Sequence, residues 1–351
     1  MRSGQQSEVN ALASVDIEEV YGQMDQMLRE RPSPLALYNK WESQNWRVAD
    51  LDFSEDKEHW GLLMPGVKEE LFRIFTQFFI GEQAVTDTLS PILLAAPDED
   101  SRIFLATQVV DEARHTVFFK KFFEDALGIS GGLNAVLAKM KPETVAGFQK
   151  IFDEDLVQAT DRCRLDPTDM AAWVRGIAVY HFVIEGMLAL TGMKFLLRVF
   201  RELGMMPGFR SGFTAVARDE SRHVNFGVGA VRRQIAERPE LAREVEEVIT
   251  GILESAVKTI EPADRSYAEQ DGIEHPNDLP PPLRLNPREV HAFSINSLTK
   301  RLRVASLSEE FCQGVEQKAW EYFGAQIDGF EATFGVDHPI RYYDRGEVEL
   351  V

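Results

Sequence analysis

The chain has few cysteines and no run of basic residues, and both shortages limit what the protein can be. Cys163 and Cys312 are its two cysteines, and they stand far apart without a CxxC pair, so neither a disulfide framework nor a thiolate zinc site is expected. The 38 basic and 57 acidic residues give a net charge of −19, which argues against a nucleic acid partner. Residues 1–20 lack the apolar core of a secretory signal. We therefore expect a cytoplasmic protein.

One apolar stretch, residues 177–197, has the length of a membrane-spanning helix and needs its own interpretation. Glu185 lies near the middle of this stretch, and a carboxylate within a lipid bilayer is costly and rare. The acidic remainder of the chain offers neither aromatic belts nor cationic flanks. We interpret the stretch as a helix buried inside a large soluble bundle, and we expect no membrane span.

Apolar residues follow helical spacing along most of the chain, and the alternation typical of strands is scarce. Four long apolar helices are predicted, at residues 71–95, 103–127, 177–197 and 213–235. Amphipathic helices are predicted to flank them, at residues 16–31, 142–161 and 241–260. A polar, proline-rich loop at about residues 261–286 precedes two further helical segments, at 287–304 and 309–334. We predict an all-α fold with residues 1–351 in a single domain, including this loop and a C-terminal helical extension.

A five-residue pattern occurs twice in the apolar helices, as DEARH at residues 111–115 and as DESRH at residues 219–223. Residues three apart on a helix share a face, so each copy directs one carboxylate and one imidazole to a common point. A metal ion requires such a convergence. Either copy alone is also compatible with an ordinary salt-bridged helix face. Two copies that share the sequence Asp-Glu-x-Arg-His favour a metal site.

A single glutamate in an apolar helix precedes each of these motifs, Glu82 before the first and Glu185 before the second. A buried carboxylate without a partner is costly, which favours a ligand role for both. One glutamate from each of two helices, with Glu-x-x-His from each of two others, is the ligand pattern of carboxylate-bridged di-iron and di-manganese bundles. We predict that one ion is bound by Glu82, Glu112 and His115 and a second ion by Glu185, Glu220 and His223. One or more of the glutamates should bridge the two ions.

Several residues near the predicted ligands allow a further interpretation. Asp111 and Asp219 are candidates to orient the ligating imidazoles, and we favour Asp219 for this role. His181, one turn before a predicted ligand, is better explained as a hydrogen-bonded core histidine than as a ligand. Gly186 and Gly192 remove side-chain volume next to the same ligand, which fits either room for an apolar substrate or close helix packing.

At these residues the sequence resembles the ribonucleotide reductase small-subunit superfamily of ferritin-like proteins. The predicted ligands follow the superfamily's order, and residues 45–60 resemble the segment ahead of its first metal helix. Within the superfamily, the stretches FIGEQAVTD, DEARHTVFF, VIEGMLALTG and DESRH are most similar to motifs of the ligand-binding oxidases. The resemblance covers roughly residues 46–230, and it implies a ferritin-like four-helix bundle core with additional flanking helices.

The resemblance to the ligand-binding oxidases also implies a chemistry. It implies two metal ions per chain, manganese and iron or alternatively two iron ions, in a homodimer that activates dioxygen, oxidises C–H bonds and binds a long-chain fatty acid or similar apolar molecule. The positions that match that group's ether cross-link are Val85 and Tyr180. Glu82 stands where reductase subunits usually carry aspartate, and Phe119 stands where a standard subunit keeps its radical tyrosine. A tyrosyl-radical subunit is therefore disfavoured.

Two other functions remain open from the sequence. The first is the small (beta) subunit of a ribonucleotide reductase that lacks the radical tyrosine, since Tyr342 and Tyr343 lie in an acidic C-terminal tail like the tyrosine that passes the radical onward in such subunits. The second is a ferritin-like iron-storage protein, against which the additional C-terminal segments argue. Our principal prediction is a cytoplasmic di-metal oxidase that reduces dioxygen and oxidises a C–H bond of itself or of a bound apolar molecule.

Overall fold

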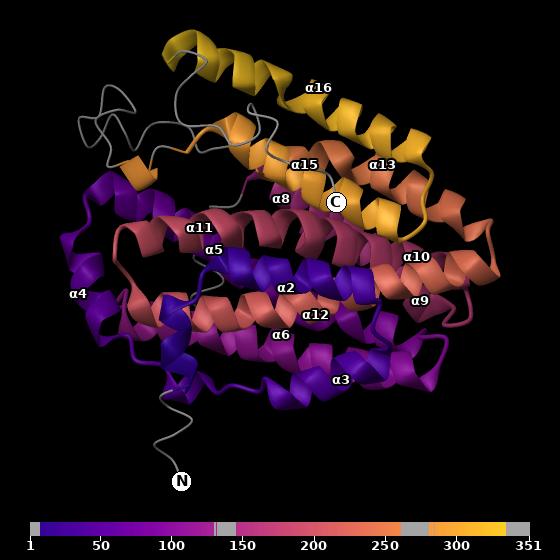
Figure 1. Cartoon of the computed structure of the whole chain (residues 1–351), viewed down its shortest axis with the longest axis horizontal. Coiled ribbons are helices and arrows are strands. Elements are labelled where there is room, and N and C mark those ends of the chain that lie inside the picture. Colours follow the sequence, from indigo (N-terminus) through magenta and orange to yellow (C-terminus); the bar gives the residue numbers. More distant parts are fainter. Residues whose placement is uncertain (1–7, 130, 132–144, 261–280, 284, 335–351) are drawn as a thin grey trace.

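All regular secondary structure in the described part of the chain is helical in the computed structural model shown in Figure 1. The structure describes residues 8–129, 131, 145–260, 281–283 and 285–334. The α-helices of nine or more residues are α2 (Ile17–Glu30), α3 (Pro34–Ser43), α4 (Ser54–Leu62), α5 (Pro65–Leu94), α6 (Glu99–Asp125), α9 (Leu156–Leu165), α11 (Leu190–Glu202), α12 (Pro207–Glu237), α13 (Leu241–Thr259), α15 (Pro287–Val304) and α16 (Glu309–Phe334). The shorter or non-α elements are η1 (Leu12–Ser14), η2 (Val48–Asp50), α8 (Ala146–Gln149), η4 (Lys150–Asp155), α10 (Met170–Ile177), η5 (Ala178–Ala189) and η7 (Pro281–Leu283). The all-α prediction is confirmed.

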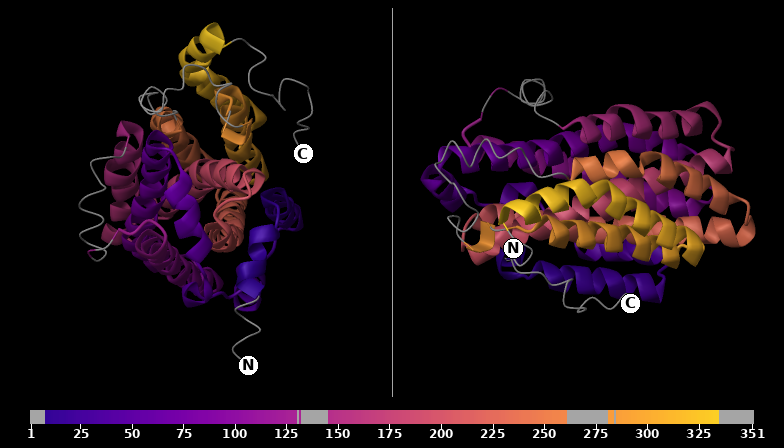
Figure 2. Two further views of the ribbon diagram at one scale, coloured as in Figure 1. Left: turned by 90° about the vertical axis from the view of Figure 1, so that its left-hand side faces the viewer. Right: turned by 90° about the horizontal axis from the view of Figure 1, so that it is seen from above.

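Four long helical segments form the centre of the molecule. They are α5, α6, α12 and the continuous run of α10, η5 and α11. Helix α5 packs along α6, while α12 packs against η5, α11 and α6. The end-on view in Figure 2 shows these segments running side by side. This is the predicted four-helix core, and each observed helix contains most of the residues predicted for it.

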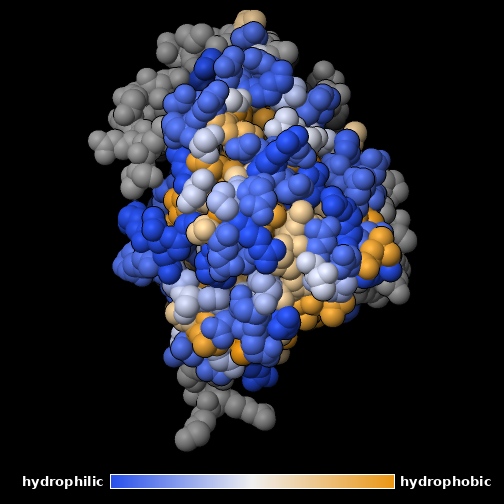
Figure 3. Space-filling view, turned by 90° about the vertical axis from the view of Figure 1, so that its right-hand side faces the viewer, coloured by the Kyte–Doolittle hydropathy of each residue, from blue (hydrophilic) through white to orange (hydrophobic). Residues whose placement is uncertain are grey.

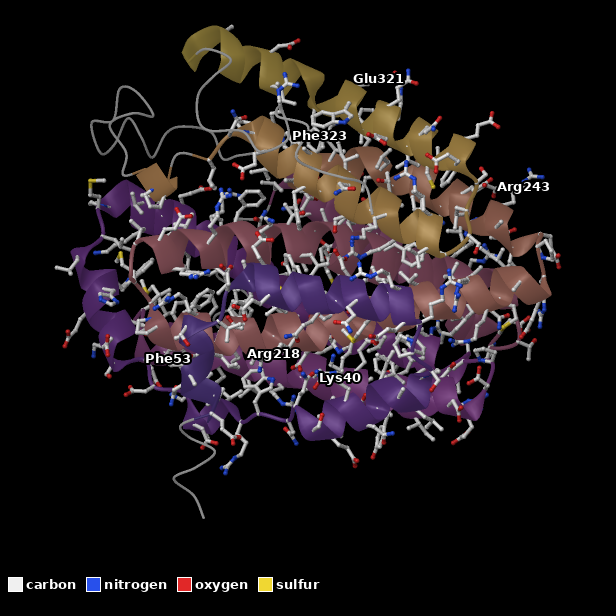
Figure 4. The ribbon with its side chains drawn as sticks, in the orientation of Figure 1. Lys40, Phe53, Arg218, Arg243, Glu321 and Phe323 are labelled. Carbon is white, nitrogen blue, oxygen red and sulfur yellow. The ribbon has the colours of Figure 1, made fainter. Side chains whose placement is uncertain are left out.

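The remaining helices cover this core on two sides. Helices α2 and α3 lie over α12 and α6, whereas α13, α15 and α16 form a second layer, in which α15 packs against η5 and also contacts α2 (Figures 1 and 2). In Figure 4 Phe323 lies on α16 facing α15, where its ring stacks on His291 with centroids 3.4 Å apart. The two C-terminal helices have the predicted bounds. The proline-rich loop lies largely outside the described residues, and Tyr342 and Tyr343 lie wholly outside them.

Helices α3 and α4 are two elements that the sequence analysis did not predict. Helix α3 begins with a standard signal, because the Ser33 hydroxyl accepts a hydrogen bond from Ala36 N and Pro34 occupies the first turn. Helix α4 supplies Asp56, whose carboxylate accepts hydrogen bonds from Gly208 N (2.8 Å) and Phe209 N (2.7 Å). Asp56 thus caps the N-terminus of α12, which carries the second motif, and fixes where that helix begins.

A cluster of phenylalanines packs between α5, α6 and α12 on one side of the motifs. Phe119 is fully buried in this cluster, with ring centroids 5.8 Å from Phe213 and 6.1 Å from Phe78. The other rings that contact it include Phe79, Phe118, Phe123 and Phe209, and Phe75 and Phe122 extend the cluster. Edge-to-face and tilted contacts of this kind favour one fixed arrangement of the three helices. The cluster therefore fixes the relative position of the helices that carry the predicted ligands.

The apolar stretch at residues 177–197 is buried, as predicted, but its central part is not an α-helix. Residues Ala178–Ala189 form the π-helix η5, in which Leu190 N donates to Glu185 O five residues earlier. None of the helices in the described ranges is both long enough and apolar enough to cross a membrane. Figure 3 shows one end of the molecule, where hydrophobic residues reach the surface in small groups between hydrophilic ones.

Candidate metal centre

The six predicted ligands converge inside the four-helix core. Glu82 comes from α5, Glu185 from η5, and one Glu-x-x-His pair comes from each of α6 and α12. All six residues are buried. Their ligand atoms form two groups, each with all atoms within 4.8 Å of one another, namely Glu82, Glu112, His115 and Glu220, and Glu112, Glu185, Glu220 and His223. Because Glu112 and Glu220 belong to both groups, they have the position of bridging ligands between two ions.

The two histidines present the same ring nitrogen to the carboxylates. His115 Nδ1 lies 3.2 Å from Glu82 Oε2 and 3.4 Å from Glu112 Oε2. His223 Nδ1 lies 3.3 Å from Glu112 Oε1 and 3.4 Å from Glu185 Oε1. The ring centroids are 6.2 Å apart. Each imidazole can therefore bind one ion through the lone pair of Nδ1. Its Nε2 then lies on the outer side of the cluster.

The outer nitrogen of each histidine meets the aspartate of the other motif. His115 Nε2 lies 3.2 Å from Asp219 Oδ2, and His223 Nε2 lies 3.1 Å from Asp111 Oδ2. Arg222 donates to both aspartates. In a neutral ring whose Nε2–H donates to a carboxylate, Nδ1 keeps its lone pair, which faces the metal position. The predicted orienting role of Asp219 fits this geometry, and Asp111 has the equivalent position beside His223.

Two tryptophans complete this outer layer of hydrogen bonds. Trp41 Nε1 donates to Asp111 Oδ1 and Trp46 Nε1 donates to Asp219 Oδ2, both at 2.8 Å. Lys40 on α3 and Arg218 on α12 lie farther out, near each other in Figure 4. Each aspartate is thus held by an indole, a guanidinium and an imidazole. The N-terminal segment that carries both tryptophans is therefore part of the site.

Gln108 is a residue of the site that the sequence analysis missed. It lies one turn before Glu112 on the same face of α6, and its Nε2 donates to Glu185 Oε1 at 2.9 Å. Its Oε1 lies 3.1 Å from His181 Nε2, which identifies His181 as the predicted hydrogen-bonded core residue and leaves it outside both ligand groups. The i, i+4 spacing from Glu112 was the available clue. Glutamine is mostly exposed in proteins, so spacing alone does not predict that Gln108 is buried beside the ligands.

The two residues of the predicted cross-link are both buried near the ligands. Tyr180 on η5 donates its hydroxyl to Glu112 Oε1 at 2.7 Å, so its phenol oxygen lies next to a glutamate that belongs to both ligand groups. Val85 lies on α5, three residues after Glu82, and is 4% exposed. Burial and the charge of Glu112 raise the pKa of Tyr180 well above its usual value, so the phenol keeps its proton.

The glycines next to Glu185 serve close packing. A Cβ atom on Gly186 would lie 2.7 Å from His181 O, and one on Gly192 would lie 2.6 Å from Phe78 Cζ. Both distances are shorter than a carbon atom tolerates, so neither position has space for a side chain. Of the two interpretations left open by the sequence, the structure favours helix packing over room for a substrate at these glycines.

The glutamates of the site differ in their affinity for protons. Burial raises the pKa of Glu82 to about 8 and raises the pKa of Glu185 well above its usual value. Burial acts in the same direction on Glu112, but the hydrogen bond to His115 and the charge of His223 outweigh it and lower its pKa to about 2. Without a metal, the cluster therefore holds protons on some carboxylates and negative charge on others.

The imidazoles hold protons as well. Burial favours the neutral ring, but the charge of Glu82 and the hydrogen bond to Asp219 raise the pKa of His115 well above 6.5. The hydrogen bond to Asp111 and the charge of Glu220 do the same for the pKa of His223. These protons compensate carboxylate charge that would otherwise be buried without a partner. Metal ions bound at Nδ1 would replace them.

The donor set fits two metal ions of the first transition series. Carboxylate oxygens and imidazole nitrogens suit iron and manganese, and four carboxylates offset most of the charge of two such ions. Several buried side-chain atoms make no hydrogen bond within the described part of the chain, and three of them belong to the ligand cluster: Glu185 Oε2, Glu220 Oε2 and His223 Nδ1. Buried polar atoms without partners require a compensating interaction, and coordination of a metal supplies it.

The helical fold and this carboxylate-histidine cluster define a class of protein. The family model of the ribonucleotide reductase small chain matches residues 29–263, and the chain belongs to this family. Among solved structures, the chain is similar to an R2-like ligand-binding oxidase from Sulfolobus acidocaldarius, with 26% identity over 80% of this chain and 93% of that chain and a TM-score of 0.65.

Other solved structures of R2-like ligand-binding oxidases share the fold. One is a variant with an anaerobically reconstituted Mn/Fe cofactor, which is 21% identical over 80% of this chain and 94% of that chain, with a TM-score of 0.65. Another is a variant with a non-activated Mn/Mn cofactor, which is 22% identical over 80% of this chain and 93% of that chain, with a TM-score of 0.64. Helix α15 and helix α16 lie beyond the residues that the family model matches.

Proposed function

We propose that the protein is an oxidoreductase, a di-metal oxidase that uses dioxygen to oxidise a C–H bond of its own chain or of a bound apolar molecule. The observation that carries this proposal is the pair of ligand groups that share Glu112 and Glu220. We propose manganese and iron as the metals, with two iron ions as the alternative, because the similar solved structures carry Mn/Fe or Mn/Mn cofactors. When bound, two such ions supply reductive activation of dioxygen.

The residues of the chain would bind, orient and shield these ions. Glu82 and His115 would hold one ion, Glu185 and His223 the other, and the two shared glutamates both. Burial of all six ligands keeps bulk water out of the site, which protects a reactive oxidant from side reactions. We expect Glu112→Ala and Glu220→Ala each to abolish two-metal occupancy, and full occupancy in both variants would contradict the ligand assignment.

An ether cross-link between Val85 and Tyr180 is the first oxidation that we propose. It would join a valine carbon to the phenol oxygen, with loss of one hydrogen from each residue and transfer of two electrons to dioxygen. The hydrogen bond from Tyr180 to Glu112 supports it, because it brings the phenol oxygen to the ligand cluster. The burial of Val85 one turn beyond Glu82 supports it as well.

The test of this function is a peptide-mass map of protein loaded with manganese and iron without oxygen, before and after exposure to air. A joined peptide pair that contains Val85 and Tyr180 and is lighter by two hydrogens is the expected result. Protein loaded in the same way but kept from air is the control. No cross-link and no oxygen uptake at full metal occupancy would contradict the proposal, whereas oxygen uptake without a cross-link would indicate an external substrate.

We also propose that the protein binds a long-chain fatty acid or a similar apolar molecule. The similarity to the ligand-binding oxidase from Sulfolobus acidocaldarius supports this proposal. Mass spectrometry of an organic extract of the purified protein should find one such molecule per chain. An extract without any apolar molecule would contradict this part of the function.

Because the chain belongs to the ribonucleotide reductase small-chain family, a second candidate function is a reductase small subunit that lacks the radical tyrosine. Phe119 replaces the tyrosine of a standard subunit and contacts other rings on all sides, so it offers no phenol oxygen at that position. Copurification of a large catalytic subunit, lost on deletion of residues 341–351, would favour this function over the oxidase.

A homodimer through α6 is part of the proposal. Ala106, Val110, Ala113 and Val117 form an exposed apolar stripe along α6. Two copies of the stripe in antiparallel orientation about a two-fold axis would place Ala106 opposite Val117 and Val110 opposite Ala113, so that each large side chain meets a small one. We expect Val110→Glu to halve the mass measured by light scattering, whereas the matched change Val157→Glu on α9 should leave it unchanged. A monomeric wild-type protein would contradict the dimer.

We place the protein in the cytoplasm. Both cysteines, Cys163 and Cys312, are buried and unbridged, which supports a reducing compartment. Burial raises the pKa of each thiol to about 11, so neither is a reactive thiolate at neutral pH. Fractionation of cells with an antibody against the native protein would test the location.

A further inference from the structure

The π-helix η5 carries Glu185 and Tyr180, and its C-terminal end bonds hydroxyl groups from several helices. The carbonyl of Gly186 accepts a hydrogen bond from Ser297 Oγ at 2.5 Å, and the carbonyl of Leu190 accepts one from Tyr21 OH at 2.6 Å. Where a π segment returns to an α-helix, the register of backbone hydrogen bonds changes, and carbonyls at the change can bond to side chains. Ser297 lies on α15 and Tyr21 on α2, so both covering layers hold this junction.

The hydroxyl of Ser297 has a fixed direction. Arg301, one turn later on α15, donates from Nη1 to Ser297 Oγ at 2.6 Å and also to Ser297 O. A serine hydroxyl has one proton, and with the guanidinium donating to the oxygen, that proton is directed to Gly186 O. The Ser297–Arg301 pair therefore forms one continuous hydrogen-bonded connection from α15 to the backbone of η5.

Arg301 is buried in a way that stability alone does not explain. It is 2% exposed, its Nη2 donates to Met24 Sδ at 3.3 Å, and its Nε makes no hydrogen bond. No carboxylate in the described residues lies within ion-pair distance of it. A buried guanidinium without a carboxylate partner costs free energy, which is compensated only in part by these neutral acceptors. Because burial of Arg301 costs free energy, we expect the residue to have a function other than stabilising the fold.

Gly186 on η5 leaves the space that the side chain of Arg301 occupies. A Cβ atom on Gly186 would lie 3.0 Å from Arg301 Cδ and 3.3 Å from its Nε, so a side chain there would push Arg301 away. Gly186 directly follows Glu185, whose carboxylate belongs to the second ligand group. A change in the position of the Gly186 carbonyl therefore moves the ligand next to it.

We infer that Ser297 and Arg301 are positioning residues that hold η5 at Gly186 and thereby hold Glu185 at the second metal position. The inference rests on the proposed function and extends it to α15, a helix beyond the residues that the family model matches. The C-terminal helical extension then contributes to the metal centre without supplying a ligand. Neither residue contacts a ligand side chain, so both act through the backbone.

Ser294 provides a matched control on the same helix. It is buried like Ser297, but its hydroxyl donates to His291 O within α15. Ser294→Ala and Ser297→Ala therefore make the same change in the same environment, and only the second removes a contact with η5. Ser297→Thr keeps the hydroxyl, and Arg301→Lys keeps the charge but loses the planar fork that directs Nη1.

The experiment is an anaerobic titration of metal-free protein with cobalt(II), followed by its visible absorption bands. Wild-type protein and Ser294→Ala should bind two ions with the same affinities and spectrum. Ser297→Ala and Arg301→Lys should weaken the second ion about tenfold and shift its bands, and Ser297→Thr should restore both. A wild-type spectrum and affinity in Ser297→Ala would overturn the inference. Fewer than two cobalt ions in the wild-type protein would contradict the proposed function itself.

Discussion

Asp219 Oδ2 lies 3.2 Å from His115 Nε2, although the two residues belong to different copies of the Asp-Glu-x-Arg-His motif. The reciprocal pair, Asp111 and His223, has a separation of 3.1 Å. Each motif therefore supplies the carboxylate that orients the imidazole of the other. Because of this exchange, a change in one motif would affect the ion that we propose the other motif binds.

Asp219→Asn should weaken the ion bound by His115 although Asp219 is outside both ligand groups. The variant lacks the negative charge that accepts the hydrogen bond from His115 Nε2–H. The imidazole of His115 is then held less firmly, and its Nδ1 binds a metal ion more weakly. We expect a loss of roughly 10- to 100-fold in metal affinity. Asp125→Asn, at an exposed site on α6, is the control for the loss of one charge. Equal affinities of the two variants in a competition titration would show that Asp219 does not orient His115.

Metal binding should release protons and strengthen as the pH rises toward 8. Burial raises the pKa of Glu82 to about 8, and the carboxylates around His115 raise the pKa of that imidazole, so both groups are protonated at pH 7 without metal. A bound ion replaces these protons. Calorimetry at pH 7 in two buffers of different ionisation enthalpy measures the number released. Glu82→Gln should release fewer, and a wild-type titration without proton release would contradict the proton arrangement described above.

Asp56→Ala should destabilise the metal-free protein by about 2 kcal/mol, because two N–H groups at the start of α12 lose their acceptor. Asp56→Asn keeps one side-chain oxygen and should cost less. Urea denaturation followed by circular dichroism gives the free energy of unfolding of both variants. Identical values for the wild-type protein and Asp56→Ala would mean that α12 does not depend on this cap.

His181 should make the metal-free protein less stable in acid. Burial and the charge of His223 lower its pKa to about 3, whereas an unfolded histidine titrates near 6.5. Between these values the unfolded chain binds the additional proton, so the free energy of unfolding falls as the pH drops below about 6.5. The contribution of this residue from pH 7 to pH 5 is about 2 kcal/mol. His181→Gln cannot titrate, so urea denaturation at both pH values should show a smaller difference than in the wild-type protein; an unchanged difference would refute the assignment.

The ligand cluster could be predicted from the sequence because the pattern that defines it lies within short segments of single helices. Glu-x-x-His on one helix face fixes which atoms converge, and the repeat of Asp-Glu-x-Arg-His made the pattern specific. The exchange of aspartates between motifs depends on how α6 faces α12, which no spacing along the chain encodes. The π-helical form of η5 was also missed, and so was its hydrogen bond at Gly186 from Ser297, more than one hundred residues away.

The most direct test of the central claim is anomalous diffraction at the manganese and iron edges from crystals of protein loaded with both metals. We predict two peaks per chain inside the four-helix core, one beside Glu82 and His115 and one beside Glu185 and His223. Glu112 and Glu220 should contact both peaks. A single peak, or peaks away from these residues, would contradict a di-metal centre at this site.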